Sequence, residues 1–200
     1  MDFEFVENKR LKKQLEFLTE IDKMKNVFRR NALVDASRRE NDAEHSWHLA
    51  LYVMLLNEHC SEKIDVEHTV KMVVCHDLIE IYAGDTFAYD TDGYKDKKER
   101  EAASADRLFS LLDPDQSLML RSLWEEFEEK ATTESKFANA CDRLQPLLHN
   151  YLTDGLTWRE GNVKLQQVLD RMDIIRQISP GLWHIVKGVV DAYVQNGVLK

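Results

Sequence analysis

Residues 71–85 of the sequence read KMVVCHDLIEIYAGD, and this stretch decides the fold class. Its apolar residues recur at the spacing of an α-helix, and Asp65 just upstream is a suitable N-cap. Gly84 is typical of the residue that ends a helix. We therefore expect one continuous helix from Asp65 to Gly84. Its apolar face is interrupted by the adjacent pair His76 and Asp77.

The pair His76-Asp77 needs a chemical reason. A buried carboxylate without a partner is costly, and coordination of a metal ion compensates that cost. Neighbouring positions on a helix point about 100° apart, so both side chains reach one ion if the edge of the helix faces it. Glu80 follows one turn later and extends toward the same cleft. The spacing therefore indicates a metal site with an additional acid beside it.

Two other segments carry side chains of the same chemistry. His45 lies in the first turns of a helix that we expect from about residue 43 to residue 59. Asn41 and Asp42 are suitable N-caps for this helix, and Asn41 has capping-box spacing to Glu44. Imidazole is a good ligand for zinc, manganese, iron or cobalt. Asp142 interrupts the apolar face of a helix expected over residues 132–151. Each residue taken alone is more often structural than a ligand. The ordered set of a His, a His-Asp pair and an Asp on predicted helices is more specific.

Helical periodicity continues through most of the chain. Pro146 predicts a kink or a local break within its helix. Residues 27–39 are expected to form a connecting segment, and no repeat or linker divides the chain, so we expect a single domain over residues 1–200. Further helices are expected from the apolar spacing, capping residues and Pro114 over about residues 11–24, 95–112, 114–129, 163–175 and 180–195.

Composition limits the partners of the chain. Its 200 residues suffice for one domain, and 7 glycines and 3 prolines favour helices over a turn-rich β-fold. A formal net charge of −9 argues against a nucleic acid polymer or an anionic membrane as partner. The 3 cysteines form no CxxC pair, so we expect neither a thiolate zinc site nor disulfides, but a cytoplasmic protein. The N-terminus does not read as a signal peptide.

Three blocks of sequence together carry a family resemblance. They are RRENDAEHSWHLAL at 38–51, HDLIEIYAGDTFAYD at 76–90 and FANACDRLQPLLHN at 137–150. Their H…HD…D order resembles the HD-domain phosphohydrolase superfamily, and more closely its single-domain branch that contains the bacterial 5′-deoxynucleotidases. The resemblance implies an all-α helical bundle of the HD-domain type. It also implies one divalent transition metal ion (Mn²⁺, Co²⁺, Fe²⁺, Ni²⁺ or Zn²⁺) with four ligands, namely His45, His76, Asp77 and Asp142.

The resemblance also implies which residues meet the substrate. Glu80 and Asp85 are expected beside the substrate phosphate and the attacking water. We expect Glu80 near the water and Asp85 near the leaving group, as general base and general acid.

An arginine is expected to bind the phosphate. Arg30 precedes the first histidine by the same interval as an arginine that meets the phosphate in the deoxynucleotidases, and Arg38 and Arg39 are further candidates. Asn31 stands where the deoxynucleotidases have a tryptophan tied to 2′-deoxy preference. That preference is therefore not implied for this chain.

Taken together, the sequence predicts a divalent-metal-dependent phosphohydrolase. A phosphomonoesterase acting on nucleoside 5′-monophosphates or similar small phosphate esters is the leading reading. A phosphodiester or pyrophosphate hydrolase and a non-catalytic, metal-stabilised helical binding protein remain open as alternatives. The two extra acids argue against the last, since a structural metal site closes its coordination shell. The resemblance suggests a homodimer, with the apolar stretch HIVKGVVDAYV at 184–194 as a candidate surface or as core.

Overall fold

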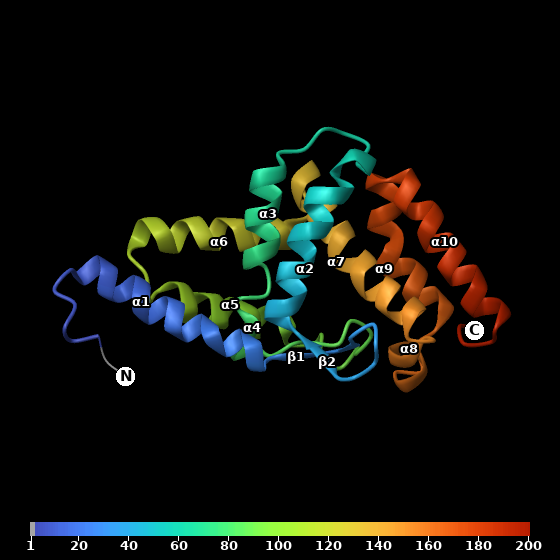
Figure 1. The fold of residues 1–200 in the computed structure, drawn as a ribbon, viewed down its shortest axis with the longest axis horizontal. Coiled ribbons are helices and arrows are strands. Elements are labelled where there is room, and N and C mark those ends of the chain that lie inside the picture. Colours follow the sequence, from blue (N-terminus) through green and yellow to red (C-terminus); the bar gives the residue numbers. More distant parts are fainter. Residues whose placement is uncertain (1–2) are drawn as a thin grey trace.

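A computed structural model of the protein describes residues 3–200, and helices dominate it (Figure 1), which confirms the predicted helical fold class. The elements in chain order are α1 (Lys9–Ile21), η1 (Asp22–Asn26), β1 (Phe28–Ala32), β2 (Arg39–Asn41), α2 (Asp42–Leu56), η2 (Asn57–His59), α3 (Val66–Cys75), α4 (Glu80–Ala83), α5 (Lys97–Phe109), α6 (Pro114–Glu129), α7 (Thr133–Leu152), α8 (Leu156–Glu160), α9 (Leu165–Ile178) and α10 (Pro180–Gln195).

Helix α7 is the central element. It packs against α2, α3, α6 and α9, while α10 covers α9 (Figure 1). The strands β1 and β2 lie at the end of the molecule where α2 begins, next to α8. Side chains from α2, α3, α7 and α9 therefore share one interior. Among the described residues, no helix has the combination of length and apolar character that crossing a bilayer requires.

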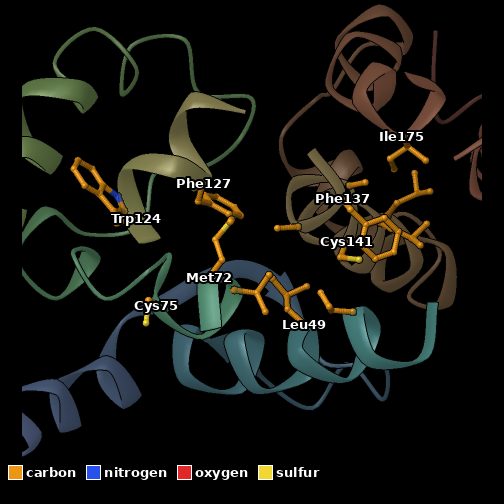
Figure 2. Packing of buried hydrophobic residues seen from close by; sticks show 14 of the residues in the cluster. Leu49, Met72, Cys75, Trp124, Phe127, Phe137, Cys141 and Ile175 are labelled. Carbon is orange, nitrogen blue, oxygen red and sulfur yellow. The ribbon is translucent and has the colours of Figure 1, made fainter. Parts of the chain in front are cut away.

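The hydrophobic core lies where these helices meet. Figure 2 shows Leu49 of α2 and Met72 of α3 on one side, with Phe137 of α7 and Ile175 of α9 on the other. All four side chains are fully buried. Burying a large apolar side chain contributes roughly 1.5–3 kcal/mol relative to leaving it exposed. This interior fixes the relative positions of the four helices.

Capping residues begin three helices at the predicted places. Asn41 and Glu44 form a capping box at the start of α2, in which each side chain accepts a hydrogen bond from the other residue's backbone N–H. Asp65 caps α3, and Pro114 is the first residue of α6. The start of α2 is thus determined locally, and it places the following turn beside α7.

The segment 27–39 differs from the prediction. We expected a connecting segment, but β1 and β2 pair as antiparallel strands with Phe28 opposite Asn41 and Ala32 opposite Arg39. Short, charged strands without a regular apolar alternation have no sequence signal. The hairpin is held by tertiary contacts, including packing of β1 against α7 and α8.

The expectation of a continuous helix from Asp65 to Gly84 is also wrong. Helix α3 ends at Cys75, and residues 76–79 form tight turns with backbone hydrogen bonds between residues three apart, such as Glu80 N–H to Asp77 O at 2.9 Å. Helical periodicity did not reveal the break because Leu78 and Ile79 remain buried and keep the apolar spacing. Gly84 does end the short α4 with φ of +76°, as predicted.

Helix α7 continues through Pro146, so of the predicted kink or local break the break does not occur, and the kink stays a prediction. Proline has no N–H to donate to the carbonyl four residues earlier, which here belongs to Asp142. Close packing on α2, α3 and α9 keeps the helix intact. The short helix α8 that follows was not predicted.

The C-terminal helix α10 contributes to the core. Val186, Val189, Val190 and Tyr193 on its inner face are buried within the chain. These residues therefore pack inside one protomer and do not provide the surface considered for a dimer. The homodimer itself stays a prediction.

The core account predicts a large cost for truncating Phe137. The variant Phe137→Ala should lower the free energy of unfolding by about 3–5 kcal/mol, because it removes a fully buried ring and leaves a cavity. Urea unfolding followed by circular dichroism measures this change. Leu118→Ala on the exposed face of α6 is the control, with an expected change of about 0.5 kcal/mol or less. Equal effects of both variants would contradict the assigned core.

Candidate metal centre

The four residues predicted as metal ligands lie together. His45 comes from the first turn of α2, His76 and Asp77 from the turns between α3 and α4, and Asp142 from α7. Nε2 of His45 is 3.1 Å from Oδ1 of Asp142 and 3.9 Å from Oδ2 of Asp77. Nε2 of His76 is 3.0 Å from Oδ1 of Asp77 and 3.8 Å from Oδ1 of Asp142. The two rings and two carboxylates therefore surround a common point.

Gln145 orients the ring of His45. Nε2 of Gln145 donates to Oε1 of Glu40 at 2.6 Å, so the amide oxygen of Gln145 faces Nδ1 of His45 at 3.2 Å. Nδ1 must then carry the proton, and Nε2 presents a lone pair to the carboxylates. Burial, with Arg29 adding to it, lowers the pKa of His45 to about 4. A neutral imidazole aimed at carboxylates suits a cation between them.

His76 is oriented by the backbone. Its Nδ1 donates to the carbonyl of Val73 at 2.7 Å, which directs Nε2 toward the two aspartates. This Nε2 is buried and makes no well-aligned hydrogen bond with the described residues, although Oδ1 of Asp77 lies 3.0 Å away. Burial alone would lower the pKa of His76, but Asp77 and Asp142 outweigh it and raise the pKa to about 9. Without a metal ion, this ring therefore carries a proton at neutral pH.

Two further acids join the cluster. Asp42 is completely buried, and neither of its carboxylate oxygens has a hydrogen-bond partner in residues 3–200. Glu80 is also buried, with its Oε2 unpartnered. Burial and the neighbouring Asp77 raise the pKa of Asp42 to about 8 and lift that of Glu80 well above its ordinary value. This density of buried acids calls for positive charge.

Arg29 supplies part of that charge, and sequence reasoning missed it. Its Nη1 lies 2.7 Å from Oδ2 of Asp77 and 3.5 Å from Oδ1 of Asp42, and its Nη2 is 3.9 Å from Oδ1 of Asp142. Burial opposes the charge of Arg29, but the surrounding carboxylates hold its pKa well above the ordinary value. Arg29 turns toward the centre from β1, whereas its neighbour Arg30 lies against Phe87.

The donor set fits a divalent cation. Two groups of three residues each bring their ligand atoms within 4.8 Å of one another. The first group is His45, His76 and Asp142, and the second is Asp42, Asp77 and Glu80. The inward-facing Nε2 of His76 and the oxygens of Asp42 are left without hydrogen bonds, although unpaired buried polar atoms are normally rare. Imidazole and carboxylate are ligands that Mn²⁺, Fe²⁺, Co²⁺, Ni²⁺ and Zn²⁺ accept.

Glu80 and Asp85 both face the cleft that opens from this centre. The cleft has a volume of about 1360 Å³ and is lined by residues of the α4–α5 loop and of α5, α6, α7 and α9. Asp85 directly follows the α4 cap, and burial raises its pKa above the ordinary value. Arg100 holds this loop by donating to the carbonyl of Ala83 at 2.6 Å and to Oγ1 of Thr86 at 3.1 Å. Both predicted catalytic acids are thus next to the centre.

Arg30 and Asn31 lie on the other side of Asp85. They line a small cavity of about 40 Å³ that also borders Asp85. The guanidinium of Arg30 stacks on Phe87 with 5.2 Å to the ring centroid, and Nδ2 of Asn31 donates to the carbonyl of Pro146 at 3.4 Å. A substrate that reaches this cavity would meet both residues.

Arg38 and Arg39 lie outside both cavities. Arg38 makes a bidentate pair with Glu44, and Arg39 pairs with Glu160 at 2.6 Å and also donates to the carbonyl of Arg30. These partners hold the hairpin to α2 and α8. The structure therefore does not bring Arg38 and Arg39 together with the metal centre.

Other residues of the centre had weak sequence signals. Asp42 was read as a possible N-cap, although it precedes His45 by three residues and so shares its helix face. Gln145 stands three residues after Asp142 on α7, which is the same kind of signal. The inward position of Arg29 could have been predicted only if strand β1 had been recognised in the sequence.

Comparisons with known proteins place the chain in one family. A family model for the HD domain matches residues 21–183. The crystal structure of a predicted metal-dependent phosphohydrolase from Magnetospirillum magnetotacticum MS-1 is 45% identical, covers 95% of each chain and has a TM-score of 0.90. The 5′-deoxynucleotidases HDDC2 of Xenopus laevis and Homo sapiens are 25% and 24% identical, over 76% and 75% of this chain and 75% and 72% of their own lengths.

The protonation of His76 predicts that cation binding depends on pH. A cation needs the neutral ring, whereas the metal-free ring, with its pKa of about 9, is protonated at lower pH. The affinity for Mn²⁺ should therefore rise between about pH 6 and about pH 8, by about tenfold per pH unit for each proton displaced. Isothermal titration calorimetry in buffers of different ionisation enthalpy measures both affinity and proton release. An affinity that is flat with pH, without proton release, would contradict the assigned centre.

Proposed function

The chain belongs to the HD-domain family, and from that premise we propose that it is a divalent-metal-dependent phosphohydrolase. The substrate that we propose is a nucleoside 5′-monophosphate or a similar small phosphate monoester, and residues 1–200 act as one domain. One observation carries the proposal. Two imidazoles and a group of buried carboxylates with unpartnered atoms meet at the base of an open cleft.

The relatives support the same chemistry. A structure that is 45% identical over 95% of this chain bears the description of a predicted metal-dependent phosphohydrolase, and the HDDC2 proteins are named as 5′-deoxynucleotidases. The HDDC2 proteins are about a quarter identical to this chain, so they support the choice of substrate class more than the choice of sugar. The proposal therefore does not include a preference for 2′-deoxyribose.

We propose that His45, His76, Asp77 and Asp142 hold the cation. A bound divalent ion acidifies water, neutralises charge on a phosphate and orients both. The backbone carbonyl of Val73 and the amide of Gln145 keep the two rings aimed at it. Arg29 balances the carboxylates that remain.

Glu80 and Asp85 move the protons in this proposal. Glu80 lines the cleft beside His76 and Asp77, where its carboxylate would accept a proton from the attacking water. Asp85, whose pKa is also raised by burial, would hold a proton for the leaving oxygen. Arg30 and Asn31 would contact the substrate from the small cavity beside Asp85.

A panel of phosphate esters assayed with Mn²⁺, Co²⁺, Ni²⁺, Mg²⁺ and Zn²⁺ tests the proposal. We expect turnover of nucleoside 5′-monophosphates that is lost after chelation. Activity only on diesters or pyrophosphates would replace the monoester proposal. Metal-dependent melting without any turnover would show a binding protein instead.

The role of Glu80 is tested by Glu80→Gln, which keeps the shape of the side chain but cannot accept the proton. Its kcat should fall by about 10²- to 10⁴-fold with smaller changes in KM and metal content. Glu67→Gln on the exposed surface of α3 is the matched control and should retain full activity. Retention of wild-type kcat by Glu80→Gln would exclude this residue as the base.

A further inference from the structure

Two arginines on the wall of the cleft lack a close carboxylate partner among the described residues. Arg143 on α7 donates only to Asn139 in residues 3–200, to the backbone carbonyl and to Oδ1, both at 2.8 Å. Arg171 on α9 has one carboxylate within ion-pair distance in the described chain, Oδ2 of Asp142 at 3.8 Å. Both side chains line the cleft. Most other arginines of this acidic protein form closer ion pairs.

Like charges gather at this wall. Arg143 and Arg171 line the cleft together with two lysines, Lys97 and Lys130. Lys97 has a close partner in Glu101 at 3.0 Å, and Lys130 lies 4.0 Å from a carboxylate oxygen of Glu128. Arg143 and Arg171 therefore lack the close carboxylate partner that Lys97 has in Glu101.

The wall adjoins the metal centre through one carboxylate. Oδ1 of Asp142 faces Nε2 of His45, and Oδ2 of the same group faces Nη2 of Arg171. The carboxylate of Asp142 thus borders both the centre and Arg171. Arg29 is less suited than Arg171 to binding an anion, because its guanidinium is surrounded by Asp77, Asp42 and Asp142.

We propose that Arg143 and Arg171 form the binding site for the phosphate dianion of the substrate. This inference rests on the proposed function and narrows it. Two guanidinium charges match the double charge of a phosphate monoester, whereas a diester carries a single charge. Guanidinium groups bind phosphate oxygens through paired, charge-assisted hydrogen bonds. The pair therefore selects monoesters over diesters.

Binding of inorganic phosphate to the Mn²⁺-loaded protein tests the site without requiring turnover. Titration calorimetry should show a dissociation constant at least about tenfold higher in Arg143→Gln and in Arg171→Gln, the loss expected for one charge-assisted bond. Arg143→Lys and Arg171→Lys keep the charge and should lose less. Arg176→Gln, an exposed residue of α9 paired with Asp173, is the matched control and should bind as wild type.

Ester selectivity gives the second measurement. In the double variant Arg143→Gln/Arg171→Gln, kcat/KM for p-nitrophenyl phosphate should fall at least about tenfold more than that for bis(p-nitrophenyl) phosphate. Metal content and melting temperature are measured for every variant. If Arg171→Gln loses metal, the phosphate affinity of Arg143→Gln tests the proposed site instead. Arg143 has no ion pair to Asp142 in the described chain, so its substitution should leave the metal in place.

Unchanged phosphate affinity in the metal-loaded Arg143→Gln protein would overturn the inference, and so would equal losses for both ester classes. These results leave the proposed function intact if the wild type hydrolyses monoesters. Conversely, phosphate binding that depends on the arginines in a protein without turnover would support the site and refute the proposed function.

Discussion

Mutual repulsion among carboxylates that are buried together is the constraint that the rest of the structure has to satisfy. Asp42, Asp77, Glu80 and Asp142 lie in one interior, where Arg29 supplies the close guanidinium and His76 adds charge when protonated. An unpaired buried charge costs several kcal/mol, and removal of one partner of a buried pair is strongly destabilising. A divalent cation at this point would relieve the repulsion. The cluster therefore fits a site for a cation better than a group that only stabilises the fold.

The fold answers this constraint with rigid supports. Asp142 lies on α7, the helix that contacts most of the core, and Phe137 and Cys141 anchor the same stretch (Figure 2). The capping box at Asn41 determines where α2 begins and hence where His45 points. The break after α3 is tied by backbone hydrogen bonds. Core packing, helix capping or backbone hydrogen bonds thus fix each element that carries a side chain of the centre.

Sequence reasoning identified what depends on local patterns. Helix positions, the capping box and the end of α4 follow from periodicity and from single residues such as Asn41 and Gly84. The residues His45, His76, Asp77 and Asp142 do lie together, and their role as ligands stays a prediction. The hairpin, the inward turn of Arg29 and the break after Cys75 could not be predicted, because tertiary packing decides them. Pro146 shows the same principle, since packing keeps its helix intact.

Anomalous diffraction from a crystal soaked in Mn²⁺ tests the central claim most directly. The account predicts a strong manganese peak between Nε2 of His45, Nε2 of His76 and the carboxylates of Asp77 and Asp142, at about 2.0–2.3 Å from each ligand atom. A well-ordered crystal without a peak there, or with its strongest peak outside the cleft, would contradict it.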